Sequence, residues 1–555
     1  MPIVGPNPNL NTPPARFRAL PWHDNHPHKR DLEQRLEPDH LARLLDAAVE
    51  RLDLTALRDS YGGTGSEAHP PERLLRVVLY EVHNGFHSPA QWYRHARENE
   101  PVRWLLRGGA VARSCWYDFR DRLAPLLSQL NQQPLAQALE AGLTTATRAA
   151  LDGTLVAANA SRHKVVTQTT LHKRLEQLAA ACAAEEPQPV AEGPAPVVAL
   201  PTADPPPAAT AEQAAPPLPA TPTPAVTDTP LQPTPAPVLP AWMATSAAGR
   251  QQQLQRLQQA RQRLQELQAN NLKKWASKRK AADAIVVSLS DPETAVGRDK
   301  EKVFRPLYNV QIVDDLDSPL ILGYEVFAQQ NDAGLLGSML TLVEQQLAHA
   351  LEVVLADASY AGGADLAVAQ AKGVTLFAPV PGDGVVNPKQ IPKREFRWQE
   401  AEQTYVCPQG HRLEFEESWR EKRVSGGIQV WRYRCPAEHC LACPVQARCT
   451  RTPESGRAVT RQEHEELIEA LRSRMESAES KQLYRLRGQN VELVNADWKE
   501  HRKLRRFSGR GLKRVRAEVG LIVLAHNLIT VQTKPKEVPP RVALPVIANP
   551  AVKTT

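Results

Sequence analysis

The chain has 555 residues, a formal net charge of +7 and a pI near 9.0. This length allows two to four domains with a sizeable core, and the basic balance favours a polyanionic partner such as nucleic acid. No apolar run reaches the roughly 18 residues of a membrane span, and the N-terminus lacks the apolar core of a signal peptide, so we expect a cytoplasmic protein with no membrane partner.

The first part of the chain predicts a helical domain that follows a loose arm. Residues 1–37 are rich in proline and polar residues and predict a flexible arm. Residues 38–145 contain amphipathic stretches, one of which starts at Pro71 and ends near Gly85, the usual places of these residues at helix ends. The resulting all-α domain could bind DNA, and a plain helical bundle with exposed charges explains the pattern equally well.

A strand is expected at residues 150–160, with Asp152 near its start. Residues 187–240 hold 18 of the 48 prolines and show no periodicity, so we expect a disordered insertion over 185–245. A helix predicted before it and another over 250–282 would form a helical hairpin with this insertion at its tip.

Alternating strand and helix patterns follow. Two strand runs surround residues 315–319 and predict a hairpin. A later apolar strand ends at Asp357, and helix and strand patterns alternate around it. These patterns predict a mixed α/β sheet covered by helices.

Five cysteines lie within 43 residues, in a segment (400–452) that interrupts the α/β pattern. They include a CxxC pair, which can close a tight turn around one Zn²⁺ ion. We therefore expect a small zinc-ribbon-like insertion, with free, partly buried thiols as the alternative. Cys115 and Cys182 lie in helical segments and are expected to act as small apolar residues.

A third carboxylate, Glu492, lies on a predicted helix that continues into a dense basic stretch. Nine Lys and Arg lie between Lys499 and Arg516, against the single acid Glu500. Carboxylates beside a phosphate-attracting surface suit a Mg²⁺ site that acts on a phosphodiester. Asp497 and Glu500 are competing candidates for this third acid, and a metal-binding role for Asp332 is a minor alternative.

Several motifs resemble the DDE transposases of bacterial insertion sequences, in the branch with a helical N-terminal domain and a Cys-containing insertion before the last acid. They are LDGTLVAANAS, ADASY and Y-x2-R-x4-E-x6-K. The resemblance runs from about residue 38 to 531. It implies an RNase H-like catalytic domain over 146–531 and a two-metal site for Mg²⁺ or Mn²⁺ held by Asp152, Asp357 and Glu492.

The resemblance also implies roles for other residues. The DNA contacts would be Tyr484, Arg487, Lys499, Arg502, Lys503, Arg505 and Arg506. The zinc ligands would be Cys407, Cys440, Cys443 and Cys449, with Cys435 as the spare thiol and His411 or His439 as substitutes. One departure is Asn495, where relatives often have an aromatic residue.

The implied function is cleavage and strand transfer at the inverted-repeat ends of an insertion sequence, by a homodimer or larger assembly in the nucleoid. Three alternatives remain at this point. They are a metal nuclease that does not join strands, a non-catalytic DNA-binding derivative, and a zinc-stabilised scaffold. The tail at 532–555 is expected to be disordered.

Overall fold

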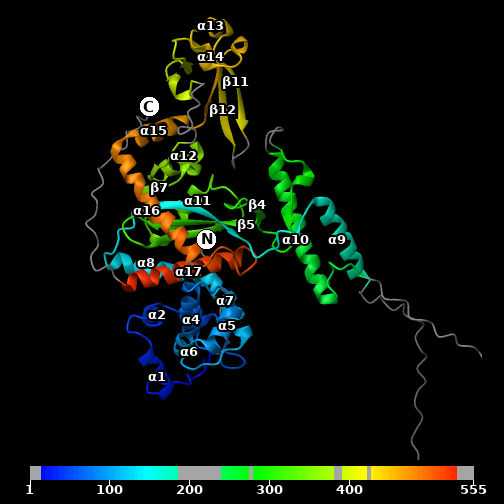
Figure 1. The fold of residues 1–555 in the computed structure, drawn as a ribbon, viewed down its shortest axis with the longest axis vertical. Coiled ribbons are helices and arrows are strands. Elements are labelled where there is room, and N and C mark those ends of the chain that lie inside the picture. The colour runs from blue at the N-terminus through cyan, green and yellow to red at the C-terminus, as the bar shows by residue number, and fades with distance from the viewer. Residues whose placement is uncertain (1–13, 185–238, 274–278, 381–390, 422–426, 534–555) are drawn as a thin grey trace, which may run out of the picture. The chain divides into compact units, whose positions relative to one another are not determined.

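The computed structural model describes residues 14–184, 239–273, 279–380, 391–421 and 427–533 (Figure 1). The chain divides into a larger unit, Met1–Gln168 with Gln259–Thr555, and a smaller unit, Thr169–Gln258. Most of the predicted Pro-rich insertion (185–238), the start of the predicted arm (1–13) and nearly all of the predicted tail (534–555) lie outside the described residues.

The N-terminal region is all helical, as the sequence predicts. Its helices are α1 (Pro27–Arg35), α2 (Leu41–Glu50), α3 (Thr55–Asp59), α4 (Pro71–His83), α5 (Pro89–Glu98), α6 (Glu100–Leu105), α7 (Arg113–Leu123) and α8 (Leu127–Glu140). Helix α4 begins at Pro71, the predicted start. Helix α1 lies inside the segment expected to be a flexible arm, because Leu32 and Leu36 bury their side chains in the helical core.

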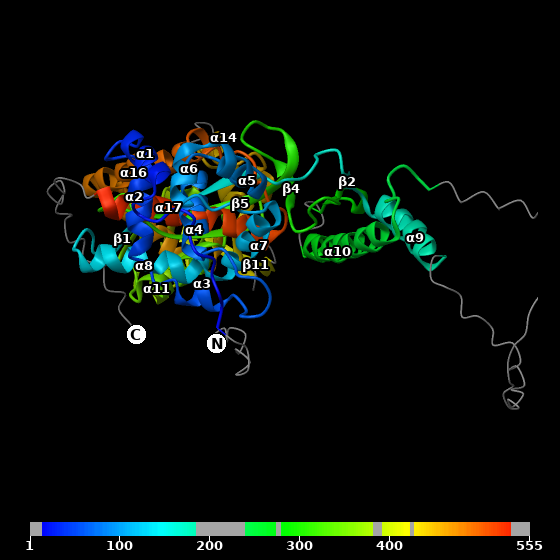
Figure 2. The ribbon, with the colours of Figure 1, turned by 90° about the horizontal axis from the view of Figure 1, so that it is seen from below.

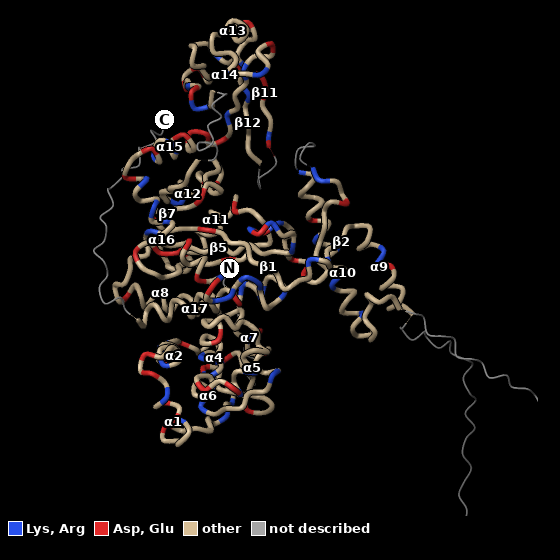
Figure 3. Tube along the Cα trace, viewed as in Figure 1, with Lys and Arg blue, Asp and Glu red and all other residues tan. Residues whose placement is uncertain are grey.

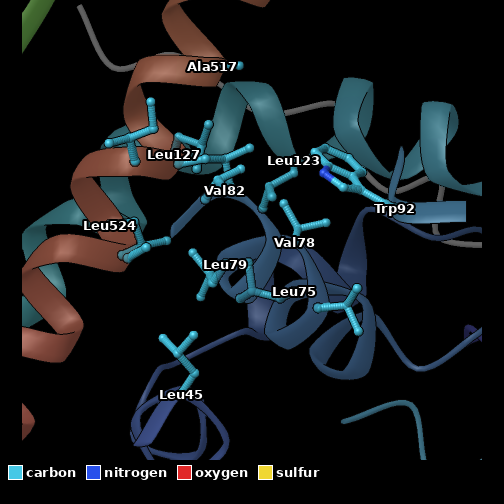
Figure 4. Packing of buried hydrophobic residues seen from close by; sticks show 14 of the residues in the cluster. Leu45, Leu75, Val78, Leu79, Val82, Trp92, Leu123, Leu127, Ala517 and Leu524 are labelled. Carbon is cyan, nitrogen blue, oxygen red and sulfur yellow. The ribbon is translucent and has the colours of Figure 1, made fainter. Parts of the chain in front are cut away.

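The core of this helical region continues into α17 (Leu512–Thr533), near the other end of the chain. Figure 4 shows Leu45 of α2, Leu75 of α4 and Leu127 of α8 in one cluster with Leu524 of α17. Helix α17 also packs against strand β6 of the main sheet. It is therefore buried from both sides, which explains its nearly continuous apolar sequence.

The main sheet is mixed, as predicted. Its strands are β1 (Arg148–Ala157), β4 (Ala295–Arg298), β5 (Phe304–Asp315), β6 (Ile321–Phe327), β7 (Val353–Leu355) and β8 (Thr375–Phe377). The order is β4-β5-β1-β7-β8, and β6 also pairs with β5. The contacts of β5 with β1, β4 and β6 are antiparallel, whereas β1, β7 and β8 are parallel. The β5–β6 hairpin predicted around residues 315–319 is confirmed.

Helices cover both faces of this sheet (Figures 1 and 2). Alternate residues of β1 are buried on opposite faces of the sheet, since successive side chains of a strand point to opposite sides. Leu151 belongs to the core formed with α11 (Leu336–Leu347), α12 (Gly363–Ala371) and α15 (Glu465–Glu476). Ala150 belongs to the core formed with α16 (Ala478–Glu500).

The cysteine-rich segment between β8 and α15 forms a second, antiparallel sheet. Its order is β13-β12-β11-β10-β9. Its elements are β9 (Arg397–Gln399), β10 (Thr404–Val406), β11 (Arg412–Glu421), β12 (Ile428–Arg434), α13 (Ala437–Leu441), α14 (Gln446–Cys449) and β13 (Ala458–Gln462). A small core of aromatic residues and cysteines holds it together.

The remaining α-helices and strands come from the chain segments on either side of the predicted Pro-rich insertion. They are the paired strands β2 (Val165–Val166) and β3 (Val287–Ser288), and helices α9 (Gln168–Ala183) and α10 (Ala247–Leu272). Helix α10 ends before the predicted boundary at 282, and the side chain of Asn271 then hydrogen-bonds the backbone of Lys280. Within the described parts of the chain, no helix combines the length and apolarity needed to cross a membrane.

Leu524 of α17 is part of the core of the helical region, and this position generates a stability prediction. Leu524 is fully buried, so Leu524→Ala should lower the free energy of unfolding by about 2–5 kcal/mol. Leu493, on α16, is 65% exposed, so Leu493→Ala should change it by less than about 0.5 kcal/mol. Chemical denaturation of both variants measures the difference, and equal effects would contradict the shared core.

Candidate active site

The parallel pairing of β1 with β7 places two acids side by side. Ala150 of β1 is opposite Leu355 of β7. Asp152 and Asp357 each follow two residues later, at the same edge of the sheet and on the same face, because the side-chain period of a strand is two. This is the C-terminal edge of the parallel strands, where α/β sheets commonly place functional groups.

The turn after β7 fixes Asp357. Its side chain accepts a hydrogen bond from the backbone N–H of Ser359 at 2.7 Å and caps a short 3₁₀ helix (Ala358–Tyr360). The Ser359 hydroxyl lies 3.4 Å from the other carboxylate oxygen. One oxygen of Asp357 is therefore held by a short bond to the turn, and the other has only this long contact.

Helix α16 covers these acids. Leu483 and Val491 pack against Ala150 and Leu355, which anchors the helix on the Asp152 face of the sheet. Glu492 follows Val491 at the rim of this contact, with its side chain 65% exposed. The helix therefore brings the third predicted acid to the same edge, exposed to solvent. Acidic and basic positions are interspersed along α15 and α16 (Figure 3).

Two side chains of α16 hold Asp152. Arg487 donates from Nη2 to Oδ1 at 2.8 Å, and Asn495 donates from Nδ2 to Oδ2 at 2.8 Å. The other Arg487 terminal nitrogen lies 3.7 Å from Glu492 Oε1. The guanidinium thus bridges the first and third acids. No sequence pattern indicates the Asn495 contact, since its partner lies more than 300 residues away.

Burial raises the pKa of the Asp152 carboxyl above its ordinary value, and the side chain is only 14% exposed. The positive charge of Arg487 opposes this rise in the pKa, and the negative charge of Asp357 adds to it. A second negative charge near the Asp152 carboxylate favours a cation beside it.

Two further predicted DNA contacts lie beside the acids. The Tyr484 hydroxyl donates to the carbonyl of Ala356 at 3.1 Å, directly before Asp357. Lys499 is half-buried, and burial together with the charge of Lys300 lowers its pKa, while Asp152 opposes that shift. Lys499 and Lys300 therefore lie within electrostatic range of the Asp152 carboxylate.

The loop after α16 connects to the N-terminal helices. Arg502 binds Asp497 at 3.0 Å and the carbonyl of His83 at 2.6 Å, and its own carbonyl accepts from His87. The Lys503 ammonium lies 4.9 Å above the Phe86 ring. Both predicted DNA contacts therefore also hold the loop in place.

The other predicted phosphate contacts are more open. Arg505 pairs with Glu500 and is 58% exposed. Arg506 is exposed and makes a long contact of 3.5 Å with Asn159. The competing acids Asp497 and Glu500 are thus paired with Arg502 and Arg505 rather than turned towards Asp152.

A polar network lies on the opposite face of β1. Asp332 Oδ1 accepts from Asn309 Nδ2 and Gln311 Nε2, both at 2.7 Å. The Tyr360 hydroxyl donates to Gln311 Oε1. A side chain at Gly153 would overlap Asp332 and Gln311. Asp332 therefore has a local structural role on the face of the sheet opposite the acids. Because Gly153 has no side chain, Asp332 and Gln311 can approach the backbone of β1 closely.

The cysteines gather at one end of the second sheet. Cys435, Cys440 and Cys449 are buried in its small core, and Cys407 packs against it. Burial raises the pKa of the Cys435 thiol to about 12, and the neighbouring Cys440, Cys407 and Cys449 add to the shift. Cys443 contributes in the same way to a raised pKa of Cys449. The five thiols therefore lie within electrostatic range of one another at this end of the sheet.

Over the described residues, no three His, Cys, Asp or Glu side chains converge tightly enough to form a metal site. The donor sets nevertheless fit the implied metals. Oxygen donors suit Mg²⁺ or Mn²⁺ and thiolates suit Zn²⁺. At the acids a cation is already present, because the Arg487 guanidinium lies between Asp152 and Glu492.

A cavity of about 560 Å³ lies elsewhere in the fold, between α8, β6, α11 and α17. Its lining includes Asn131, Tyr324 and Arg516. None of the three predicted acids lines this cavity, so it is separate from the candidate site at the sheet edge.

The comparisons with known proteins match two segments of this fold. Residues 406–531 match the family described as a transposase DDE domain, and residues 30–122 match the transposase domain family DUF772. No curated protein and no solved structure matches the chain. The chain is therefore a transposase, an enzyme that cuts DNA and transfers its strands. More narrowly, the two matches indicate a DDE transposase of an insertion sequence.

The matched segments cover only part of the candidate site. Glu492 lies inside the DDE match, whereas Asp152 and Asp357 lie between the two matched segments. The assignment of Glu492 and the two aspartates to one site therefore depends on the geometry of the sheet edge, not on the family matches.

Gly153 offers a test of this edge. The added methyl group of Gly153→Ala has to displace Asp332 and Gln311, so we expect a loss of roughly 1–3 kcal/mol in unfolding free energy. The nearest atom to a Cβ at Gly62 is 3.8 Å away, so Gly62→Ala is the matched control and should be nearly neutral. Thermal unfolding distinguishes them, and an unchanged Gly153→Ala protein would contradict the close packing beneath β1.

Proposed function

We propose that Asp152, Asp357 and Glu492 form the catalytic centre of this transposase, which acts at the ends of an insertion sequence. The observation that carries the proposal is the convergence at one sheet edge. Two acids follow equivalent positions of neighbouring parallel strands, and a helix that carries Glu492 donates two hydrogen bonds to the first of them.

We further propose that the catalytic domain, at 146–531, is RNase H-like. The supporting observation is the strand order β6-β5-β1-β7-β8, with three antiparallel strands followed by two that are parallel to β1. The last acid follows on a helix after the sheet, with the cysteine-rich segment inserted before it. The helical region at 38–145 is the proposed DNA-binding domain.

The transposase family implies divalent metal ions. The three acids would hold Mg²⁺ or Mn²⁺, and bound cations of this kind lower the pKa of water and stabilise charge on a leaving oxygen. Around them, Ser359 keeps the Asp357 carboxylate on its turn. Leu483 and Val491 keep the acid-bearing helix against the sheet.

The proposed reaction has two displacements at phosphorus. Water attacks the phosphodiester at the element end, and the P–O3′ bond breaks to leave a 3′-hydroxyl and a 5′-phosphate. That 3′-hydroxyl then attacks a target phosphodiester, so a new P–O bond forms as the target's own P–O3′ bond breaks. Both steps use the same acids, since both need charge stabilised on an oxygen that leaves phosphorus.

The proposed DNA surface continues from the acids along α16 and its following loop. Lys499 and Lys300 lie within electrostatic range of the Asp152 carboxylate, and they are the proposed contacts for a phosphate next to the reacting one. Arg487 and Tyr484 are the proposed contacts at the acids themselves. The proposed contacts beyond α16 are Lys503, Arg505 and Arg506, which are exposed, and Arg502, whose main role would be to hold the loop.

An element has two inverted ends, and a symmetric pair of ends fits a symmetric oligomer. We therefore propose a homodimer or larger assembly bound to both ends and to target DNA. The family matches do not favour the nuclease or the non-catalytic alternative.

The three acids generate the main functional prediction. Asp152→Asn, Asp357→Asn and Glu492→Gln keep the side-chain shape and remove a charge, so DNA binding should persist. Cleavage of a labelled element end with Mg²⁺ or Mn²⁺ should fall at least about a thousandfold, since metal-assisted charge stabilisation supplies several kcal/mol. Asp497→Asn is the matched control and should retain cleavage. Full cleavage by any one of the three variants would remove that residue from the centre.

For the cysteine-rich segment we propose a structural Zn²⁺ bound by Cys407, Cys440, Cys443 and Cys449. The purified protein should contain about one zinc per chain, since a tetrahedral site needs four N or S ligands. Cys443→Ser should lose the metal and loosen the second sheet, whereas Cys115→Ser is the control and should keep it. Elemental analysis and limited proteolysis measure both effects. A zinc-free native protein that resists proteolysis would contradict the site.

A further inference from the structure

Asn495 is a buried, uncharged side chain that is hydrogen-bonded to one of the three acids. It lies on α16, three residues after Glu492, and is 8% exposed. Its Nδ2 donates to Asp152 Oδ2 at 2.8 Å. Its own Oδ1 is buried without a hydrogen-bond partner among the described residues. The carboxylate accepts only from the amide nitrogen, so this bond sets the orientation of the amide.

The two donors to Asp152 differ in a way that matters for a metal. Arg487 holds Oδ1 with a positive charge, which competes with any cation that approaches Asp152. Asn495 holds Oδ2 with a neutral amide, which can keep its bond when a cation binds to Oδ1. Outer hydrogen-bond partners of this kind orient metal-binding carboxylates and tune their affinity.

We propose that Asn495 is a positioning residue for the metal site. It fixes Asp152 so that Oδ1 faces the cation, and it connects the helix that carries Glu492 to the strand that carries Asp152. This bond from α16 to β1, together with the Arg487 contacts, sets the spacing between the first and third acids. This inference rests on the proposed function, because it takes Asp152 as a metal ligand.

The chain supplies a matched control on the same helix. Asn490 is also an asparagine of α16, but its Nδ2 donates to the carbonyl of Leu486 at 2.8 Å, within the helix. Asn490→Ala therefore removes an equal side chain without a change at Asp152. Asn495→Leu keeps the volume of the buried side chain and removes the donor, which separates the hydrogen bond from simple packing.

The test titrates Mn²⁺ alone against the full chain, without DNA, and follows free Mn²⁺ by electron paramagnetic resonance. Asn495→Ala and Asn495→Leu should each weaken Mn²⁺ binding by about tenfold or more, the usual effect of a lost outer partner. Asn490→Ala should bind Mn²⁺ as the unmutated protein does. Melting temperature and DNA binding in EDTA should be the same for Asn495→Leu and Asn490→Ala.

Two results would overturn the positioning role. One is Mn²⁺ affinity unchanged in both Asn495 variants. The other is a weaker affinity that appears equally in Asn490→Ala, which would make the effect one of general helix stability. Asp152→Asn in the same titration separates this inference from the proposed function. Unchanged Mn²⁺ binding in that variant means the metal site itself is wrongly placed, whatever the Asn495 variants do.

Discussion

The pairing of β1 with its two neighbours is the constraint on which the rest of the structure depends. The antiparallel contact with β5 and the parallel contact with β7 place β1 at the centre of the sheet. Asp152 and Asp357 become neighbours only because of this register. A shift of one residue would turn Asp152 to the opposite face, where the Asp332 network lies. Packing around β1 therefore maintains the relative position of the two aspartates as well as the fold.

Helix α16 adds the second half of the site, and α17 holds the surrounding elements together. The apolar contact of Leu483 and Val491 with the sheet lets polar side chains of the same helix reach Asp152. The loop between the two helices binds His83 and His87 in the N-terminal region through Arg502. The proposed DNA surface, the acids and the helical region are thus connected through one continuous stretch of chain.

Local patterns predicted much of this arrangement. Pro71 indicated a helix start, the polar break after Asp315 indicated a hairpin, and the strand before Asp357 was visible from its apolar run. The family resemblance indicated which acids belong together. Local patterns could not predict contacts between distant segments, such as the pairing of β1 with β7, because these strands are separated by about 200 residues in the chain. Asn495 looked like a departure from a pattern, and its hydrogen bond to Asp152 became visible only in the fold.

The central claim is that Asp152, Asp357 and Glu492 surround one cation-binding centre. The most direct measurement replaces the metal with Fe²⁺ and adds ascorbate, so that radicals formed at the bound ion cut the nearby polypeptide backbone. The account predicts cuts near residues 152, 357 and 492 that excess Mg²⁺ suppresses. Cuts confined to other segments, or cuts at only one of the three acids, would contradict it.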